Sequence, residues 1–222
     1  MEQLFKAILF IHIASGTVGL LAGTINMVRK KGDKWHRVIG KAFLYGMLST
    51  GFCSFILASI HPSLFLFMVG VFTVHLVGTG QRYLALKQLH NNQQPQLVDW
   101  ALAALMLLGG LTLIGFGVYY LIEAEVFGLV YIVFGSSGLA NVYSDVKNYQ
   151  GKITNKNYWL VLHIGRMVGG YIAAITAFLV VNSSHFPSVM QGTVLWLLPT
   201  FIFVPLMIFW SRKIKNIPVT SN

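Results

Sequence analysis

Long apolar runs separated by short polar connections make up almost the whole chain. Seven of these runs reach about 20 residues, the length at which a helix rising ~1.5 Å per residue crosses a hydrocarbon core ~30 Å thick. The pattern predicts helices at 4–28, 38–60, 64–86, 98–122, 125–145, 158–181 and 192–210. We therefore expect an all-α polytopic membrane protein, a seven-transmembrane-helix bundle that forms one integral membrane domain over residues 1–222.

The polar connections are too short to form a separate domain. The longest three cover 29–37, 87–98 and 145–157. Composition agrees with a chain surrounded by lipid, since 55% of the 222 residues are hydrophobic and 10% are charged. These features exclude a receptor with a large ectodomain and a soluble enzyme with a tail anchor, so any chemistry lies among the helices or at their ends.

Basic residues gather on alternate connections, which predicts the topology. Fourteen of the sixteen Lys and Arg residues follow the first, third, fifth and seventh runs: Arg29, Lys30, Lys31, Lys34, Arg37, Lys41, Arg82, Lys87, Lys147, Lys152, Lys156, Arg212, Lys213 and Lys215. Because positive connections remain in the cytoplasm, the N-terminus is expected outside and the C-terminus inside, in a bacterial cytoplasmic (inner) membrane. Short basic loops beside helix ends also argue against a nucleic-acid partner despite the net charge of +10. Tyr83 is expected among the aromatic anchors of the inner interface.

The only cysteine, Cys53, lies within the second predicted helix. One cysteine cannot form a disulfide within the chain, a thiolate metal cluster or the paired attachment of a c-type haem. Its position predicts a small core residue.

Ionisable side chains inside apolar helices point to a functional site. A charge near the bilayer centre costs roughly 2.5 to 3.5 kcal/mol even on the most lenient scale, so such groups face the bundle interior. His12, His75, His163 and Arg166 lie within the runs, and glycine accompanies each histidine on its helix face. Three such histidines on separate helices indicate a shared ligand, and His36 adds another imidazole at the inner interface.

A haem explains this distribution, because a bis-histidine haem takes one imidazole from each of two helices and needs small residues beside them. His12 and His75 form the first predicted pair of iron ligands. His36 and His163 form a second pair nearer the cytoplasm. Guanidinium groups match carboxylates in a bidentate way, so the residues expected to hold the haem propionates are Arg37, Arg82 and Arg166.

Two short motifs carry a resemblance to known proteins. The stretch His12-Ile-Ala-Ser-Gly16, then Arg29, then Trp35-His36-Arg37-Val-Ile-Gly40, resembles the histidine-bearing helix pair of transmembrane b-type cytochromes that act as ascorbate-dependent ferric reductases. This resemblance implies that His12 and His36 are haem ligands and that His75 completes the first pair. The chain as a whole is similar to a bacterial family of multi-pass membrane proteins defined as a domain of unknown function, which implies topology and no activity.

The function expected on this basis is that of a haem b protein in the lipid bilayer, with transmembrane or quinol-linked electron transfer as its activity. Its partners would be a quinone or another redox carrier, and as an enzyme it would be a haem-dependent oxidoreductase. The iron would carry the redox chemistry, while the protein supplied ligands, propionate partners and a low-dielectric pocket.

A polar path through the bundle is an alternative. Ser137, Asn141 and Asp145 share a face of the fifth predicted helix, and His75 and Arg166 lie inside the third and sixth. Polar residues at these depths are typical of substrate and ion pathways in transporters. This hypothesis predicts a small-solute or ion transporter.

A hydrolase is the second alternative. Gly135-Ser-Ser-Gly138 and His163-Ile-Gly-Arg-Met-Val-Gly169 are similar to the serine and histidine motifs of rhomboid intramembrane proteases. That resemblance implies Ser137 as nucleophile and His163 as base, a dyad that is sufficient for acyl transfer.

Overall fold

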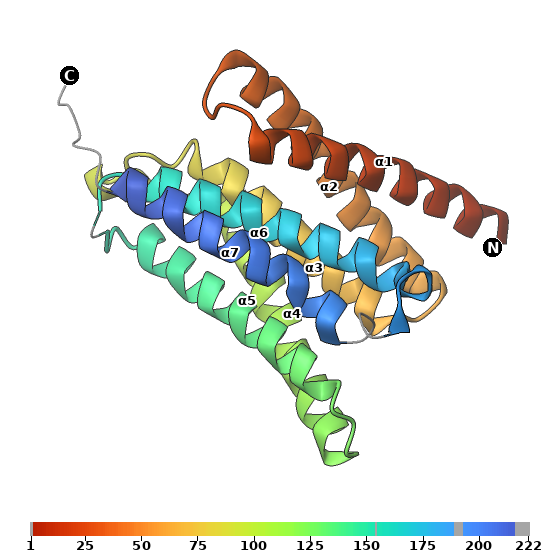
Figure 1. Ribbon diagram of the computed structural model, residues 1–222. Coiled ribbons are helices and arrows are strands. Elements are labelled where there is room, and N and C mark those ends of the chain that lie inside the picture. The colour runs from red at the N-terminus through yellow and green to blue at the C-terminus, as the bar shows by residue number, and fades with distance from the viewer. Residues whose placement is uncertain (1, 154, 189–192, 216–222) are drawn as a thin grey trace.

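The computed structural model describes residues 2–153, 155–188 and 193–215 (Figure 1). All regular secondary structure in this part of the chain is helical, and it contains no strand. The helices are α1 (Glu2–Val28), α2 (Lys34–Ile60), α3 (Leu64–Tyr83), α4 (Leu97–Ile122), α5 (Gly128–Tyr149), α6 (Tyr158–Val181) and α7 (Thr193–Lys215), with single turns η1 (Leu89–Asn91) and η2 (Ser183–His185). Each predicted apolar run corresponds to one long helix, which confirms the all-α prediction.

Six of the long helices are both long and apolar enough to cross a membrane: α1, α2, α3, α4, α6 and α7. The prediction of an integral membrane protein is confirmed at this level. α5 is not among the six, because Asn141, Ser144 and Asp145 lower its hydrophobicity.

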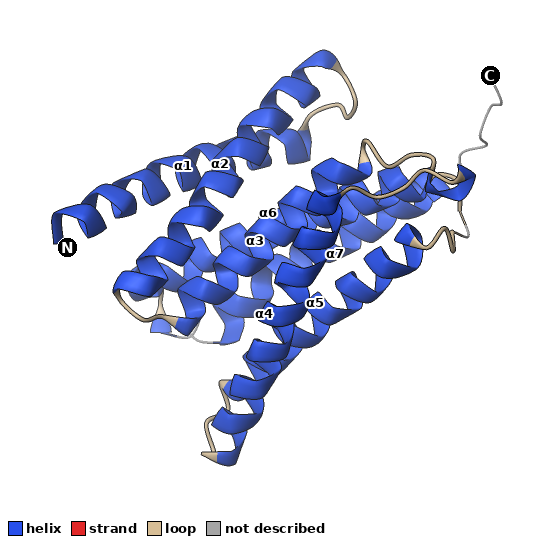
Figure 2. Cartoon of the chain, turned by 180° about the vertical axis from the view of Figure 1, so that it is seen from behind, coloured by secondary structure: helices blue, strands red, loops and turns tan. Residues whose placement is uncertain are grey.

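Successive helices run in opposite directions, so the connections gather at two ends of the bundle. Connections 29–33, 84–96 and the described residues 150–153 and 155–157 lie at one end together with the end of α7, and we call this the basic end (Figures 1 and 2). Connections 61–63, 123–127 and 182–188 lie at the opposite end. The structure thus separates the two groups of connections that the charge pattern distinguishes.

α3 occupies the centre of the bundle and packs against α2, α4 and α6. α1 pairs with α2, α4 pairs with α5, and α7 lies along α6. Toward the opposite end, the tip of the α4–α5 hairpin projects away from the other helices (Figures 1 and 2). Near this tip, Phe127 and Phe134 still contact Trp196 on α7, with ring centroids 5.3 and 6.0 Å from that of the tryptophan.

Glycines bring α4 and α5 into close contact. A Cβ added at Gly128 would lie 2.5 Å from the Gly117 carbonyl oxygen, and one at Gly135 would lie 2.8 Å from that of Gly110. Both distances are too short for any side chain, so the two backbones approach each other as in small-residue membrane helix pairs. We call this contact the glycine seam, and it makes the hairpin a single rigid unit.

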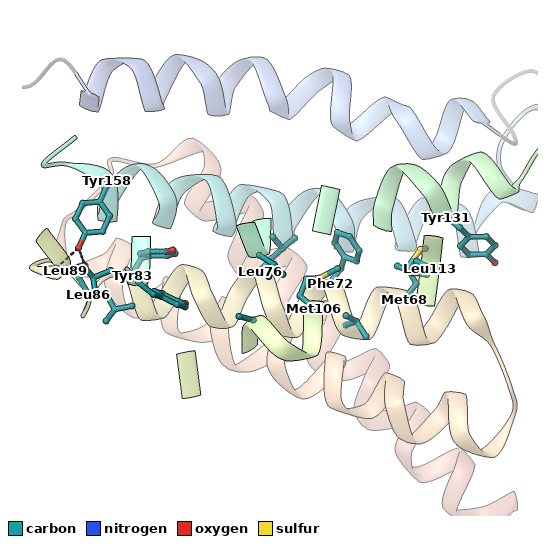
Figure 3. Packing of buried hydrophobic residues seen from close by; sticks show 14 of the residues in the cluster. Met68, Phe72, Leu76, Tyr83, Leu86, Leu89, Met106, Leu113, Tyr131 and Tyr158 are labelled. Atoms are coloured by element: carbon teal, nitrogen blue, oxygen red, sulfur yellow. Dashed lines mark hydrogen bonds between the residues drawn. The ribbon is translucent and has the colours of Figure 1, made fainter. Parts of the chain in front are cut away.

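Apolar and aromatic side chains fill the space around α3 (Figure 3). Phe72, Leu76 and Met106 form its middle, and Tyr83, Leu86 and Tyr158 close it at the basic end. The Tyr158 hydroxyl donates to the Leu86 carbonyl and accepts from the backbone N–H of Leu89. These bonds hold the connection after α3 against α6 and fix the position of Tyr83.

Candidate functional site

Arg166 on α6 lies at the centre of a buried polar cluster. Its side chain is 3% exposed, and its Nη2 donates to Asp145 Oδ1 at 2.7 Å and to the Asn141 carbonyl at 3.0 Å. Both acceptors belong to α5. The ion pair therefore links the α4–α5 hairpin to α6.

His75 on α3 completes the cluster from the other side and is fully buried. Its Nδ1 lies 3.0 Å from the Leu102 carbonyl, and because a carbonyl only accepts, Nδ1 carries the proton. The lone pair of Nε2 then accepts from Arg166 Nη1 at 3.1 Å. His75 is thus a neutral imidazole in one fixed tautomer.

Asp145 is fully buried, and its two oxygens have different surroundings. Oδ1 accepts from Tyr83 Oη at 2.6 Å as well as from Arg166. Oδ2 has no hydrogen-bond partner, although it lies 3.6 Å from His75 Nε2. A buried carboxylate oxygen without a donor is costly, so this atom is a candidate position for a proton.

A cavity of about 560 Å³ opens beside Arg166, between α5, α6 and α7. Its lining is Phe72, Leu76, Leu129, Val130, Val133, Phe134, Ser137, Asn141, Leu162, Gly165, Arg166, Gly169, Ile172, Ala173, Trp196, Leu197, Thr200, Val204 and Met207. Arg166 is the one charged residue in this lining. A Cβ added at Gly165 would meet no atom within 4 Å, so this glycine widens the cavity and is not required for packing.

Arg82 and Asp99 form a second ion pair between α3 and α4, in which Asp99 is fully buried and the Arg82 side chain is 24% exposed. Arg82 donates through Nε and Nη2 to the two oxygens of Asp99, at 2.7 and 2.9 Å. Asp99 also accepts from the Gln96 backbone N–H at 2.7 Å, within the capping box of α4. Neither residue lines the cavity. The pair is complete in itself and anchors the start of α4 to α3.

The other histidines contact different helices. His12 Nδ1 donates to the Thr50 carbonyl on α2 at 3.2 Å, and His163 Nδ1 donates to the Gly80 carbonyl on α3 at 2.8 Å. His36 lies close enough to His163 for an electrostatic interaction, and its own Nδ1 is buried without a partner.

The residues of the first expected haem pair do not fit a haem in this arrangement. The obstacle is His75, the expected partner of His12, because both of its ring nitrogens are occupied and its ring has no exposed surface. Arg82 and Arg166, expected at the propionates, have carboxylate partners within the chain, and Arg37 is exposed. Across the described residues, no three His, Cys, Asp or Glu side chains gather to hold a metal ion.

The serine and histidine of the hydrolase hypothesis lie in different surroundings. Ser137 is exposed on α5 and faces the cavity, whereas His163 is bonded to α3 and is not part of the cavity lining. Within the described part of the chain, no hydrogen bond joins the two side chains. The structure therefore does not present them as a nucleophile and its base.

Tyr83 belongs to the cluster, but the sequence did not predict this. Its position at a helix end indicated an aromatic anchor at the membrane interface instead. Its spacing from His75 is the available signal, since residues eight apart lie about two turns apart along a helix and about 80° apart around it, on the same broad side. The residues that α7 contributes to the cavity wall, including Trp196, were also not predicted from the sequence.

Comparison with family models, with curated proteins and with solved structures finds no match for the chain. The function is therefore argued from the site itself. That site combines a buried ion pair, a neutral histidine and a mainly apolar cavity at the junction of α3, α5, α6 and α7.

Proposed function

We propose that this protein is a seven-helix membrane carrier that binds a small solute in the cavity between α5, α6 and α7. The observation that supports this proposal is the His75–Asp145–Arg166 cluster at the edge of the cavity. In this proposal the N-terminus lies outside and the basic end lies in the cytoplasm of a bacterial cell, because basic connections remain inside.

The seventh crossing in this proposal is α5. The glycine seam holds it along α4, which is apolar enough to cross a membrane. Of the residues that make α5 polar, Asp145 bonds to Arg166 through its side chain, and Asn141 lines the cavity. Its polarity is thus directed toward the interior of the bundle, as expected for a helix that lines a path.

Stability alone does not account for the buried ion pair. Replacing a buried salt bridge by packed apolar residues is often neutral or stabilising by about 1 to 4 kcal/mol. Arg166 and Asp145 nevertheless lie together at a cavity whose volume, about 560 Å³, is in the range of ligand sites. Charges kept at such a position are typical of substrate pathways in membrane proteins.

The α4–α5 hairpin is the element that would move. It is rigid because of the glycine seam, and Asp145 bonds it to α6 through Arg166 and to α3 through Tyr83. Loosening these bonds would leave the Arg82–Asp99 pair as a pivot at the start of α4. The hairpin could then rock against α6 and α7 and change the side from which the cavity is open. Rigid-body motion of one helix group against another is the usual basis of alternating access.

Cysteine accessibility tests the carrier without knowledge of its solute. Cys53 is the only native cysteine, so Cys53→Ala gives a background in which one cysteine can be placed at will. In membrane vesicles of both orientations, we expect Ser137→Cys to react with a membrane-impermeant maleimide from either side. Ser137→Cys combined with Gly165→Leu should react more slowly, because the leucine fills the cavity.

Gly115→Cys on the same background is the control. Gly115 is exposed on α4, outside the cavity lining, and a carrier predicts no reaction there with a reagent that does not enter lipid. Reaction of Ser137→Cys from one side only would contradict alternating access.

A haem b electron carrier is the second candidate, on one specific observation. His163 donates Nδ1 to a backbone carbonyl and leaves Nε2 available near His36, an arrangement typical of ligating imidazoles. His36 and His163 would hold the iron, which would supply one-electron chemistry. A b-type band at near-stoichiometric iron, lost in His163→Ala, would support this candidate, and colourless protein from cells supplied with haem precursor would contradict it.

A further inference from the structure

The Arg82–Asp99 and Arg166–Asp145 pairs are not equivalent. Arg82 engages both oxygens of Asp99, so that pair is bidentate. Arg166 engages one oxygen of Asp145, leaves Oδ2 without a donor and directs Nη1 at a neutral imidazole. Among the described residues, the pair beside the cavity therefore has a carboxylate oxygen without a donor, whereas both oxygens of Asp99 accept from Arg82.

We propose that the solute is an amphipathic monocarboxylate whose carboxylate replaces Asp145 at Arg166 while Asp145 takes up one proton on Oδ2. This inference rests on the carrier function proposed above and adds the substrate class and the coupling ion.

The chemistry of the cavity selects an anion with an apolar tail. Arg166 is the one charge in the lining, and a guanidinium matches a carboxylate through two parallel hydrogen bonds. Ser137 and Asn141 add polar groups beside it. Most of the remaining wall is apolar, with Phe72, Phe134 and Trp196 as its aromatic side chains, and suits a hydrocarbon chain.

The charge balance requires one proton per anion. The cluster holds one positive guanidinium, one negative carboxylate and a neutral imidazole, so its net charge is zero. A bound carboxylate adds one negative charge in a buried region of low dielectric constant, where unbalanced charge is costly. A proton taken from water and bonded to Asp145 Oδ2 restores neutrality, and no bond of the solute breaks.

The proton has a defined acceptor. When Arg166 Nη1 turns to the solute, His75 Nε2 loses its donor and becomes free to accept. Protonated Oδ2, now 3.6 Å from this nitrogen, can donate to it after a small shift, while Nδ1 keeps its bond to Leu102. One hydrogen bond to His75 thus replaces another.

The groups that face Asp145 come from all the elements around it. They are Arg166 from α6, His75 and Tyr83 from α3, Asp99 from α4 and Tyr149 on α5 itself. Two bases other than Asp145 are present in this group, His75 and Asp99. Asp99 is already held by Arg82, which leaves Asp145 and His75 as the pair that shares the added proton.

Calorimetric titration of the purified full-length protein with octanoate tests the inference. Repeating the titration in buffers of different ionisation enthalpy gives the number of protons taken up, and we expect about one per octanoate bound. Octan-1-ol, which has the same chain and no charge, should bind about tenfold or more weakly, because it lacks the charge-assisted bonds to Arg166. Arg166→Gln should weaken octanoate binding by a similar factor.

Asp145→Asn tests whether octanoate binding and proton uptake can be separated. The amide resembles the protonated acid, so this variant should still bind octanoate while proton uptake falls to zero. Asp99→Asn is the matched control, because it changes the same residue type in the other pair and should keep an uptake of about one proton.

Three outcomes have distinct meanings. The inference is supported if the wild type takes up one proton per octanoate bound and Asp145→Asn binds octanoate without proton uptake. Equal binding of octan-1-ol, or octanoate binding without proton uptake, overturns it while two-sided labelling of Ser137→Cys upholds the carrier. One-sided labelling would overturn the carrier itself.

Discussion

Nε2 of His75 and Oδ2 of Asp145 face each other at 3.6 Å inside the bundle, and neither atom carries a hydrogen in the arrangement described. Two acceptors in this position repel each other weakly, and the unpaired oxygen costs about 1 to 3 kcal/mol. One proton between them would convert the repulsion into a hydrogen bond. The geometry of the two residues thus favours a site that gains and loses a proton over one that only holds helices together.

The ion pair should show strong energetic coupling. Asp145→Asn leaves the guanidinium of Arg166 buried without a counter-charge, so the free energy of unfolding should fall by about 3 to 5 kcal/mol. Arg166→Gln should cost a similar amount, and the double variant should cost clearly less than the sum. Unfolding in mixed micelles measures all three, and additive losses would show that the two charges do not interact.

Tyr83 and Tyr149 offer a matched pair of hydroxyl deletions. Tyr83→Phe removes a donor from the Asp145 carboxylate and should lower the free energy of unfolding by about 1 to 3 kcal/mol. Tyr149→Phe removes a buried hydroxyl that has no partner, so the change should stay within about 0.5 kcal/mol or stabilise the protein. Equal losses in the two variants would contradict the assigned hydrogen bonds.

The glycine seam predicts position-dependent effects of the same substitution. Gly128→Ala places a Cβ against the Gly117 carbonyl, and we expect a loss of about 1 to 3 kcal/mol as the helices separate. Gly115→Ala meets no atom within 4 Å and should stabilise α4 by up to about 1 kcal/mol through helix propensity. Thermal unfolding of the two variants should therefore shift in opposite directions.

Asp33 predicts an acid-sensitive contribution at the start of α2. The backbone N–H of His36 and the Arg29 guanidinium donate to this carboxylate and hold its pKa below the ordinary value. A lowered pKa in the folded state adds stability that is complete above about pH 4 and is lost as the pH falls through the folded pKa.

Asp33→Asn tests this contribution, because asparagine can still cap the helix but does not titrate. The difference in melting temperature between wild type and variant should be constant near neutral pH and should shrink in acid. Parallel curves throughout would show that the carboxylate does not contribute through its charge.

Much of the fold follows from local sequence, because a helix in lipid must satisfy its own backbone hydrogen bonds and present an apolar surface. The seven helices, and the burial of His75 and Arg166 inside the bundle, could be predicted on that basis. Even the polar face of α5, with Asn141 and Asp145, follows from a spacing of four residues.

The partners of these residues could not be predicted in the same way. The haem hypothesis expects Arg166 at the propionates, and the polar-path alternative groups it with Asp145. The structure places it against Asp145, and this contact depends on how α5 and α6 rotate relative to each other. The cavity likewise depends on the divergence of the α4–α5 hairpin from α7, a property of packing among distant segments. No periodicity within one helix contains that information.

The close fit of α4 and α5 also bears on how the protein is made. On its own, α5 lacks the length of apolar sequence that carries a segment out of the translocation channel into lipid. Its backbone lies against that of α4, an apolar helix synthesised just before it, so the two can leave the channel together as one hairpin. The carboxylate of Asp145 can thus reach the bilayer interior during synthesis, with α4 beside it until α6 arrives with its arginine.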